Sequence, residues 1–263
     1  TISLRRHGRR RVSGEQQSGG RAASGLRGAA GRFAAIGDLR SLSMTASSRH
    51  LHLVRHGEVE NPNHVVYADL DGFGLSARGV AQADTAAGYL ASAPVAIVVA
   101  SPLQRARETA EAIFTAHRNA RFEVDERLTE WKLGSRWAGT VWEDLPDRFP
   151  GELEAYLANP DDLPFAPESL DDAARRFAAA AEAAFASIPD GDVVVVSHQD
   201  PVQAGRLHLT GRSFDNFHER KPGHAAVITL AQRTAPEAGW HRTDWWEPEQ
   251  GPAFPPVGDP SNT

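Results

Sequence analysis

The chain has 263 residues, of which 41 % are hydrophobic and 24 % charged, a composition that is ordinary for a soluble globular protein. It contains no cysteine, which excludes disulfides, cysteine metal sites and thiol catalysis. The sequence holds no apolar run of about 18 residues, so it predicts no membrane-spanning helix and no membrane partner. The formal net charge of −6 argues against nucleic acid as a partner.

The charge is divided unevenly along the chain. Residues 1–43 contain nine arginines and only two acidic residues, so this segment carries about +7 and the remainder about −13. Its Gly, Ser and Ala content cannot offset the entropy lost on ordering, so we expect residues 1–43 to be a disordered basic leader. We favour an extension upstream of a natural start at Met44. A basic tail that contacts a polyanion and an organelle transit peptide are the alternatives.

Strand and helix patterns alternate from Met44 onward. Apolar runs predict strands at 50–55, 95–100, 121–125, 192–197, 225–231 and 240–245. Helical spacing predicts helices at 76–90, with Ser76 as N-cap, and at 103–114, 170–188 and 201–210. Residues 131–168 are rich in Trp, Pro and Asp and predict an irregular lid insertion with short helices.

This alternation predicts an α/β fold, a three-layer sandwich with a central, mainly parallel sheet and helices on both faces. We expect residues 44–250 to form a single domain that includes the lid, and residues 251–263 to form an irregular tail. In such sheets, sites lie beyond the carboxyl ends of the strands.

Arginines and histidines follow three of the predicted strands. Arg55 and His56 end the first strand, Arg105 comes shortly after the second, and His198 follows the run DVVVVS. Arginine offers a planar fork of donors to phosphate, and a neutral histidine can act as a nucleophile. These residue types therefore indicate a pocket for a phosphoryl group. The chain has no glycine-rich P-loop, which excludes a nucleoside triphosphatase of that type.

Four motifs together resemble the histidine phosphatase superfamily, also called the phosphoglycerate mutase-like family. They are LVRHGE at 53–58, LSARGVAQA at 75–83, SPLQRARETA at 101–110 and VVVVSH at 193–198. The resemblance covers about residues 49–231 and implies an α/β fold with a helical insertion. It also implies metal-free phosphoryl transfer through a phosphohistidine. A second RHG at 6–8 has no strand before it, and we expect no function for it.

The resemblance implies a catalytic role for five residues. His56 matches the phosphorylated nucleophile, Arg55 and Arg105 the arginines that grip phosphate, and His198 the histidine that stabilises charge in transfer. Glu130 matches the proton donor of one branch of the family, because Gln199 stands where the other large branch has an aspartate. Cationic neighbours would keep the His56 imidazole unprotonated.

Two positions depart from the family pattern. An asparagine is usual six residues after the nucleophile, where this chain has Pro62 between Asn61 and Asn63. We expect Asn61 to contact substrate through a shifted loop, with Asn63 as the alternative. Gln199 replaces a glycine and is also expected to bind substrate. Asp200 places a second carboxylate near the pocket mouth, either for substrate or as an alternative acid.

The predicted function is a cytoplasmic, metal-independent phosphomonoesterase that acts on a small phosphate ester and needs no cofactor. A phosphoglycerate-type mutase with the same chemistry and a catalytically idle phospho-ligand-binding protein are the alternatives. His50 and His52 share one face of the first strand, as in some metal hydrolases, but they lie at its start and lack further ligands at a suitable spacing. No pattern indicates the substrate or the oligomeric state.

Overall fold

The structure is a computed structural model in which residues 49–233 and 239–248 are described. The predicted leader at 1–43 and the predicted tail at 251–263 lie outside these residues. In the described part of the chain, no helix combines the length and the apolar composition needed to cross a membrane.

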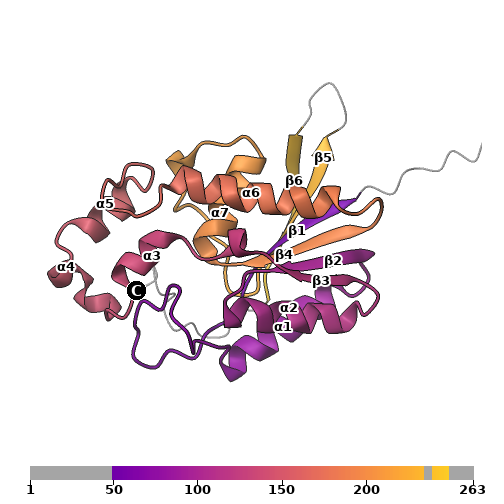
Figure 1. Cartoon of the computed structure of the whole chain (residues 1–263), viewed down its shortest axis with the longest axis horizontal. Helices are drawn as coiled ribbons and strands as arrows, with labels where there is room; N and C mark the ends of the chain where they lie inside the picture. Colours follow the sequence, from indigo (N-terminus) through magenta and orange to yellow (C-terminus); the bar gives the residue numbers. More distant parts are fainter. Residues whose placement is uncertain (1–48, 234–238, 249–263) are drawn as a thin grey trace, which may run out of the picture. The chain divides into compact units, whose positions relative to one another are not determined.

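The described residues form a six-stranded sheet in the order β3-β2-β4-β1-β5-β6 (Figure 1). The strands are β1 (His50–Arg55), β2 (Val95–Ala100), β3 (Arg121–Val124), β4 (Asp192–Ser197), β5 (Val227–Arg233) and β6 (Gly239–Trp246). The pairings β1–β4, β2–β4 and β2–β3 are parallel, whereas β5 runs antiparallel to both of its neighbours. The predicted mainly parallel sheet is therefore confirmed.

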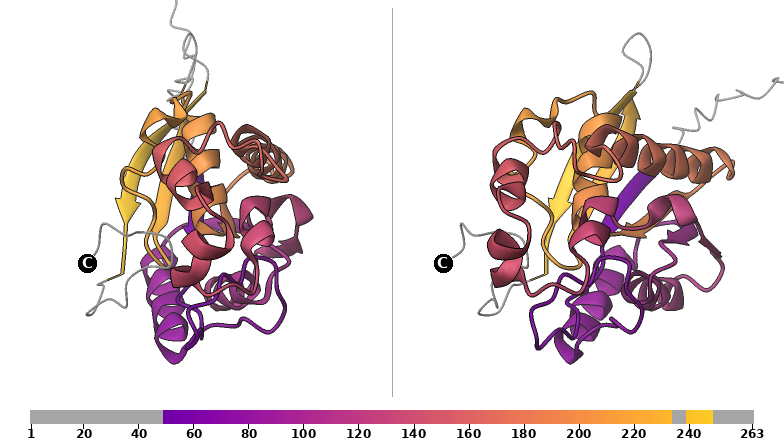
Figure 2. Two further views of the ribbon diagram at one scale, coloured as in Figure 1. Left: turned by 90° about the vertical axis from the view of Figure 1, so that its left-hand side faces the viewer. Right: turned by 60° about the vertical axis from the view of Figure 1, so that its left-hand side comes forward.

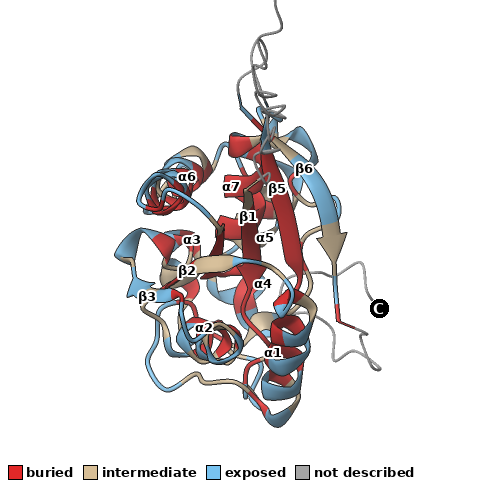
Figure 3. Ribbon diagram, turned by 90° about the vertical axis from the view of Figure 1, so that its right-hand side faces the viewer, coloured by how far each residue is buried: buried red, intermediate tan, exposed pale blue. Residues whose placement is uncertain are grey.

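Helices cover both faces of this sheet (Figure 2). One face packs against α1 (Ala77–Leu90) and α2 (Gln104–Ala116), and the other against α6 (Leu170–Ala186) and α7 (Gln199–Leu209). Valines alternate along β4 between the two apolar cores, which explains why all of this strand is buried. Figure 3 shows β1 and β5 buried, while much of β6 at the sheet edge is exposed.

Local chemistry explains where the helices and strands begin. Ser76 caps α1 as predicted, its hydroxyl accepting from the Gly79 amide. Helix α7 begins at Gln199, two residues earlier than predicted. Pro201 has no amide hydrogen to donate, and it fits in the first turn because amides there have no acceptor within the helix. Strand β5 begins two residues later than predicted because Ala225 has φ 57°, which no strand residue adopts.

The predicted lid insertion consists of short helical pieces. They are α3 (Lys132–Trp137), η2 (Trp142–Asp144), α4 (Leu145–Arg148) and α5 (Glu152–Ala158). A 3-10 turn, η1 (Glu126–Leu128), precedes them, and another, η3 (Phe214–Asn216), follows α7. Trp131, Trp137 and Tyr156 pack with α6 and α7 in a third apolar cluster, so the insertion is anchored to the sandwich by aromatic side chains.

The turn after β1 packs on the start of α1 without any side chain between the two backbones. A Cβ atom built on Gly57 would collide with the backbone of Gly79, and one built on Gly79 would collide with the Glu58 carbonyl. The two glycines therefore permit an approach that any other residue would prevent. This contact fixes the position of the residue that precedes Gly57, which is His56.

Candidate active site

Three parallel strands bring their carboxyl ends together at one edge of the sheet. Arg55 at the end of β1 lies in register with Ser197 at the end of β4, and Ala100 of β2 pairs with Val196. The His56 amide continues this ladder by donating to the Ser197 carbonyl at 2.9 Å. The residues that follow these strands therefore converge, as their positions in the sequence predict.

His56 is held as a neutral imidazole with one defined tautomer. Its side chain is almost fully buried, and its Nδ1 lies 2.7 Å from the Gly57 carbonyl, which can only accept a hydrogen bond. The proton is therefore on Nδ1, and Nε2 carries a lone pair that accepts from Arg105 Nε at 3.3 Å. Burial first, and then the charge of Arg105, lower the pKa of His56 well below its usual value. Such an imidazole can attack an electrophile through Nε2.

Two buried arginines flank this nitrogen. Arg105, in the first turn of α2, donates to the Ala68 carbonyl at 2.5 Å, and its guanidinium carbon lies 4.6 Å from the centre of the Tyr67 ring. Arg55 donates to the Pro222 carbonyl and to His224 Nε2, each at 2.9 Å. These contacts fix both guanidinium groups in place, so that their N–H groups can bind the oxygens of a phosphate.

His198 lies edge-on to His56, with ring centres 5.2 Å apart. Its Nε2 is 2.8 Å from the Ser101 hydroxyl, whereas its buried Nδ1 has no hydrogen-bond partner among the described residues. The Nε atom of Arg55 is buried and unpartnered in the same way. Buried polar atoms without partners are rare and require an explanation. Two of them beside the lone pair of His56 suit a site that receives an anion.

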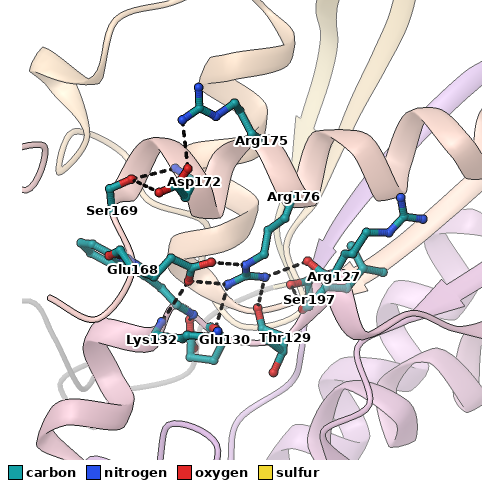
Figure 4. A network of polar contacts seen from close by, with 12 residues as sticks. Arg127, Thr129, Glu130, Lys132, Glu168, Ser169, Asp172, Arg175, Arg176 and Ser197 are labelled. Carbon is teal, nitrogen blue, oxygen red and sulfur yellow. Dashed lines mark hydrogen bonds and ion pairs between the residues drawn. The ribbon is translucent and has the colours of Figure 1, made fainter.

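Glu130 lies between η1 and α3 and is held by its backbone. Figure 4 shows Arg176 of α6 reaching across to this segment. Its guanidinium donates at 2.7–2.9 Å to the carbonyls of Arg127, Thr129 and Glu130. It also forms an ion pair with Glu168 at 2.6 Å. Glu130 is therefore placed by a partly buried ionic network that fixes its backbone.

The Glu130 carboxyl can carry a proton near neutral pH. Burial first, and then the negative charge of Asp200, raise its pKa to about 7. One oxygen accepts from the Trp131 amide at 2.8 Å, and the other lies 3.8 Å from His198 Nδ1. A carboxylic acid whose pKa lies near the working pH is suited to general acid and base catalysis.

These groups face a cavity of about 100 Å³ whose walls combine charged and aromatic side chains. Its lining residues are Arg55, His56, Val66, Tyr67, Ala68, Glu130, Trp131, Leu133, Gly134, Trp137, Trp142, Tyr156, Gln199 and Asp200. Two of the wall tryptophans, Trp131 and Trp137, are only 2 % and 3 % exposed, so they serve the packing of the insertion and the cavity wall at once.

The structure brings most of the predicted site residues together. Four of them line the cavity, and Arg105 and His198 contact His56 directly. Asn61 is the exception, because its side chain bonds the backbone amide and carbonyl of Val65 and does not line the cavity. Asn63 is exposed and does not line it either. The substrate contact expected of Asn61 therefore has no support in this geometry, since its amide already stabilises its own turn.

Sequence reasoning missed two residues beside the site, His224 and Lys221. His224 accepts from Arg55, and Lys221 donates to Asp200 at 2.8 Å and to the Tyr156 hydroxyl at 2.5 Å. The sequence carried a signal for them, because β5 runs antiparallel to β1 and the loop before β5 must therefore end at the sheet edge where β1 ends. The polar residues just before an antiparallel neighbour of the first strand are therefore also site candidates.

The paired histidines at the start of β1 are engaged in a different contact. His52 lies 3.3 Å from Asp192 and 3.0 Å from the Thr229 hydroxyl, at the opposite end of the strand from His56. Across the described ranges 49–233 and 239–248, no group of three or more His, Cys, Asp or Glu is arranged to hold a metal ion.

Known proteins match most of this chain. The model of the histidine phosphatase superfamily (branch 1) matches residues 51–245. An uncharacterized protein of Mycobacterium tuberculosis (strain CDC 1551 / Oshkosh) is 38 % identical over 191 residues, which cover 68 % of this chain and 87 % of that protein. The glucosyl-3-phosphoglycerate phosphatase of Mycolicibacterium vanbaalenii is 33 % identical over 199 residues, 71 % of this chain and 85 % of the relative.

Solved structures show the same architecture. The native structure of a mycobacterial glucosyl-3-phosphoglycerate phosphatase superposes with a TM-score of 0.66 at 27 % identity, covering 76 % of this chain and 99 % of that one. The phosphoserine phosphatase of Entamoeba histolytica, in complex with 3-phosphoglyceric acid, has a TM-score of 0.63 at 23 % identity, with 77 % and 98 % covered. The second likeness supports the fold alone.

Proposed function

Because the chain belongs to the histidine phosphatase superfamily (branch 1), we propose that it is a metal-independent phosphomonoesterase that forms a phosphohistidine on a small phosphorylated substrate. The observation that carries this proposal is the neutral His56, whose Nε2 lone pair faces Arg105 at 3.3 Å inside the cavity. Relatives named as phosphatases of glucosyl-3-phosphoglycerate favour hydrolysis over a mutase reaction.

The proposed first step is an in-line transfer to the nucleophile. His56 Nε2 forms a bond to phosphorus while the bond from phosphorus to the ester oxygen breaks, and the Glu130 carboxyl gives its proton to that oxygen. Arg55 and Arg105 neutralise the charge on the phosphoryl oxygens, and the neutral His198 donates a hydrogen bond to them from Nδ1, a role that positioned donors perform well in a water-poor cavity. The Nδ1–H bond to Gly57 persists and stabilises the imidazolium character of the phosphohistidine.

The second step returns the enzyme to its starting state. The Glu130 carboxylate takes a proton from water, the water oxygen bonds to phosphorus, and the bond from phosphorus to Nε2 breaks. Inorganic phosphate leaves, and both His56 and Glu130 regain their original protonation. The raised pKa of Glu130 suits a group that must both give and take a proton in one cycle.

Trapping of the phosphoenzyme tests this proposal. The full chain is mixed with an aryl phosphate in EDTA-containing buffer, quenched under conditions that preserve phosphohistidine, and analysed by intact mass and peptide mapping. We expect one phosphoryl group on His56, none in the His56→Ala variant, and wild-type behaviour in a His208→Ala control, since His208 is exposed on α7. A panel of sugar phosphates, phosphoserine and glucosyl-3-phosphoglycerate then ranks substrates. Turnover by His56→Ala equal to that of the wild type would refute the mechanism.

A further inference from the structure

A second and larger cavity of about 440 Å³ is lined by none of the residues that line the candidate active site. It lies at the end of α7, beside the segment that carries η3 and against β6. Its lining residues are Arg206, Leu207, Arg212, Ser213, Asp215, Asn216, Glu219, Arg220, Arg242 and Trp245. We call it the arginine cavity.

Positive charge accumulates in the arginine cavity, although the chain as a whole has a net charge of −6. Four arginines line it against two carboxylates. Among residues 49–233 and 239–248, none of these four arginines forms an ion pair with a carboxylate. Like charges held close together destabilise a folded protein, so four arginines that share a cavity without an ion pair to a carboxylate need a reason.

Arg206 shows how unfavourable this accumulation of positive charge is. Its side chain is only 5 % exposed, and its Nε and terminal nitrogen donate at 3.3 Å and 3.0 Å to the neutral Gln203 amide oxygen. Burial first, and then the charges of the neighbouring arginines, lower its pKa to about 10. An anion in the cavity would relieve both the burial of this charge and the mutual repulsion.

One indole holds three of the guanidinium groups in place. The guanidinium carbons of Arg220, Arg206 and Arg242 lie 4.6 Å, 5.3 Å and 5.6 Å from the centre of the Trp245 ring. Cations at this distance from an indole are attracted to its ring. Arg220 also adopts φ 47°, a conformation that disfavours side chains and tends to persist where function demands it. Three of the four guanidinium groups are therefore restrained by one ring before any ligand binds, which reduces the entropy lost on binding.

We propose that the arginine cavity binds a small molecule that carries a diphosphate or two phosphate groups. Guanidinium forks match phosphate oxygens, and four of them exceed what a single orthophosphate can engage. The volume points the same way, because about 440 Å³ is more than four times the volume of about 100 Å³ at the candidate active site.

The arginine cavity is connected to the candidate active site through one short segment. Arg220 lines the arginine cavity, and the next residue, Lys221, donates to Asp200 in the other cavity. Pro222 then accepts from Arg55. Helix α7 provides a second link, since its eleven residues span about 16 Å between the two sites. A ligand that binds Arg220 therefore restrains the segment that carries Lys221, and we expect it to change KM more than the chemical step.

Calorimetric titration with methylenediphosphonate, a diphosphate analogue whose bridge is not hydrolysed, tests the site. For the full chain we expect two classes of binding, one in each cavity. The double variant Arg212→Gln/Arg242→Gln removes two exposed arginines and should lose one class, with affinity at least tenfold weaker. The matched control Arg107→Gln/Arg118→Gln removes two exposed arginines from α2 and the turn after it, and should retain both classes.

The outcomes separate this inference from the proposed phosphatase activity. Binding is measured without turnover, so absence of hydrolysis leaves the inference intact. Basal hydrolysis of an aryl phosphate by the Arg212→Gln/Arg242→Gln variant should equal that of the wild type, because neither residue lies in the candidate active site. Identical isotherms for the wild type and this variant, or equal weakening in the control pair, would overturn the proposal.

Discussion

Lys221 lies 2.8 Å from Asp200 and gives that carboxylate a cationic partner, which the other carboxyl of the cavity lacks. Glu130 lies 3.8 Å from His198, whose pKa is lowered well below its usual value by burial and then by Arg105, so the imidazole is neutral. Two carboxyl groups in one cavity thus have different environments. When two carboxyl groups in one site have different environments, one of them commonly serves as the acid and the other takes no part in proton transfer.

Substitution of each carboxyl should reveal this division of roles. Glu130→Gln should reduce kcat by about 10²- to 10⁴-fold on an alkyl phosphate, the usual contribution of general acid catalysis. The reduction should be much smaller on an activated aryl phosphate, whose leaving group departs without a proton. Asp200→Asn should change KM or substrate preference instead, because it releases Lys221 and Tyr156. Steady-state kinetics on both substrates measure the difference.

A pre-steady-state burst controls for the step that limits turnover. The leaving group affects kcat only where phosphorylation of His56 limits turnover. A burst with an aryl phosphate would show that breakdown of the phosphoenzyme is limiting, and the rates of phosphorylation would then be compared from the burst phase. If Asp200→Asn carried the dependence on the leaving group and Glu130→Gln did not, the acid would be Asp200. The chain would then lie outside the glutamate branch.

The pH profile of kcat/KM should follow the protonation of Glu130. The acid form is required and its pKa is raised to about 7, so activity on an alkyl phosphate should fall about tenfold per pH unit above that value. His56 is required unprotonated, and its lowered pKa keeps it so well below pH 6.5. Glu130→Gln should abolish the alkaline decline. A wild-type profile that is flat from pH 6 to pH 9 would contradict the assignment.

Much of this site could be predicted from the sequence because its residues directly follow buried strands. Arg55 is the last residue of β1, and His56 and His198 directly follow β1 and β4, so the parallel register alone brings them together. The contacts of Lys221 could not be predicted in this way, because they depend on how a loop of no regular pattern returns to the sheet. The orientation of Asn61 could not be predicted for the same reason, since a short turn decides where its amide points.

Arg176 should act as a positioning residue for Glu130. Arg176→Gln removes donors to three carbonyls of the segment that carries Glu130, and should cost about 1–3 kcal/mol of stability. Turnover of an alkyl phosphate should fall about tenfold more than turnover of an aryl phosphate, measured on folded protein. Arg175→Gln is the matched control. Arg175 is the neighbour of Arg176 on α6, and its side chain forms ion pairs with exposed carboxylates (Figure 4). Equal losses on both substrates would indicate a purely structural role.

Removal of metal ions should leave activity unchanged. Arg55 and Arg105 supply the positive charge that a metal would otherwise provide, and His198 adds a neutral hydrogen-bond donor. Assays after dialysis against EDTA, with and without added zinc or manganese, measure the effect. Activity that disappears with EDTA and returns with metal would contradict the proposed mechanism and would indicate a catalytic metal site at His50 and His52. Asp192→Asn removes the carboxylate that both histidines approach, and we expect it to reduce stability and leave catalysis unchanged. If a metal were bound there, the same substitution would impair catalysis.

Two glycines of α1 provide a paired test of how the nucleophile is placed. Gly79→Ala introduces a Cβ that collides with the Glu58 carbonyl, so the turn that carries His56 must move. Overpacking of this kind typically costs about 1–3 kcal/mol. We expect kcat/KM to fall at least tenfold, because a displaced His56 loses its alignment with Arg105.

Gly88→Ala is the matched control, because it makes the same chemical change on the same helix. A Cβ built on Gly88 meets no atom within 4 Å, and alanine favours a helix over glycine by about 0.5–1 kcal/mol. Gly88→Ala should therefore stabilise the fold slightly and leave kcat/KM unchanged. Denaturant unfolding and kinetics on the two variants measure both effects. Wild-type stability and turnover in Gly79→Ala would show that the turn after β1 adapts, and that the backbone contact does not place the nucleophile.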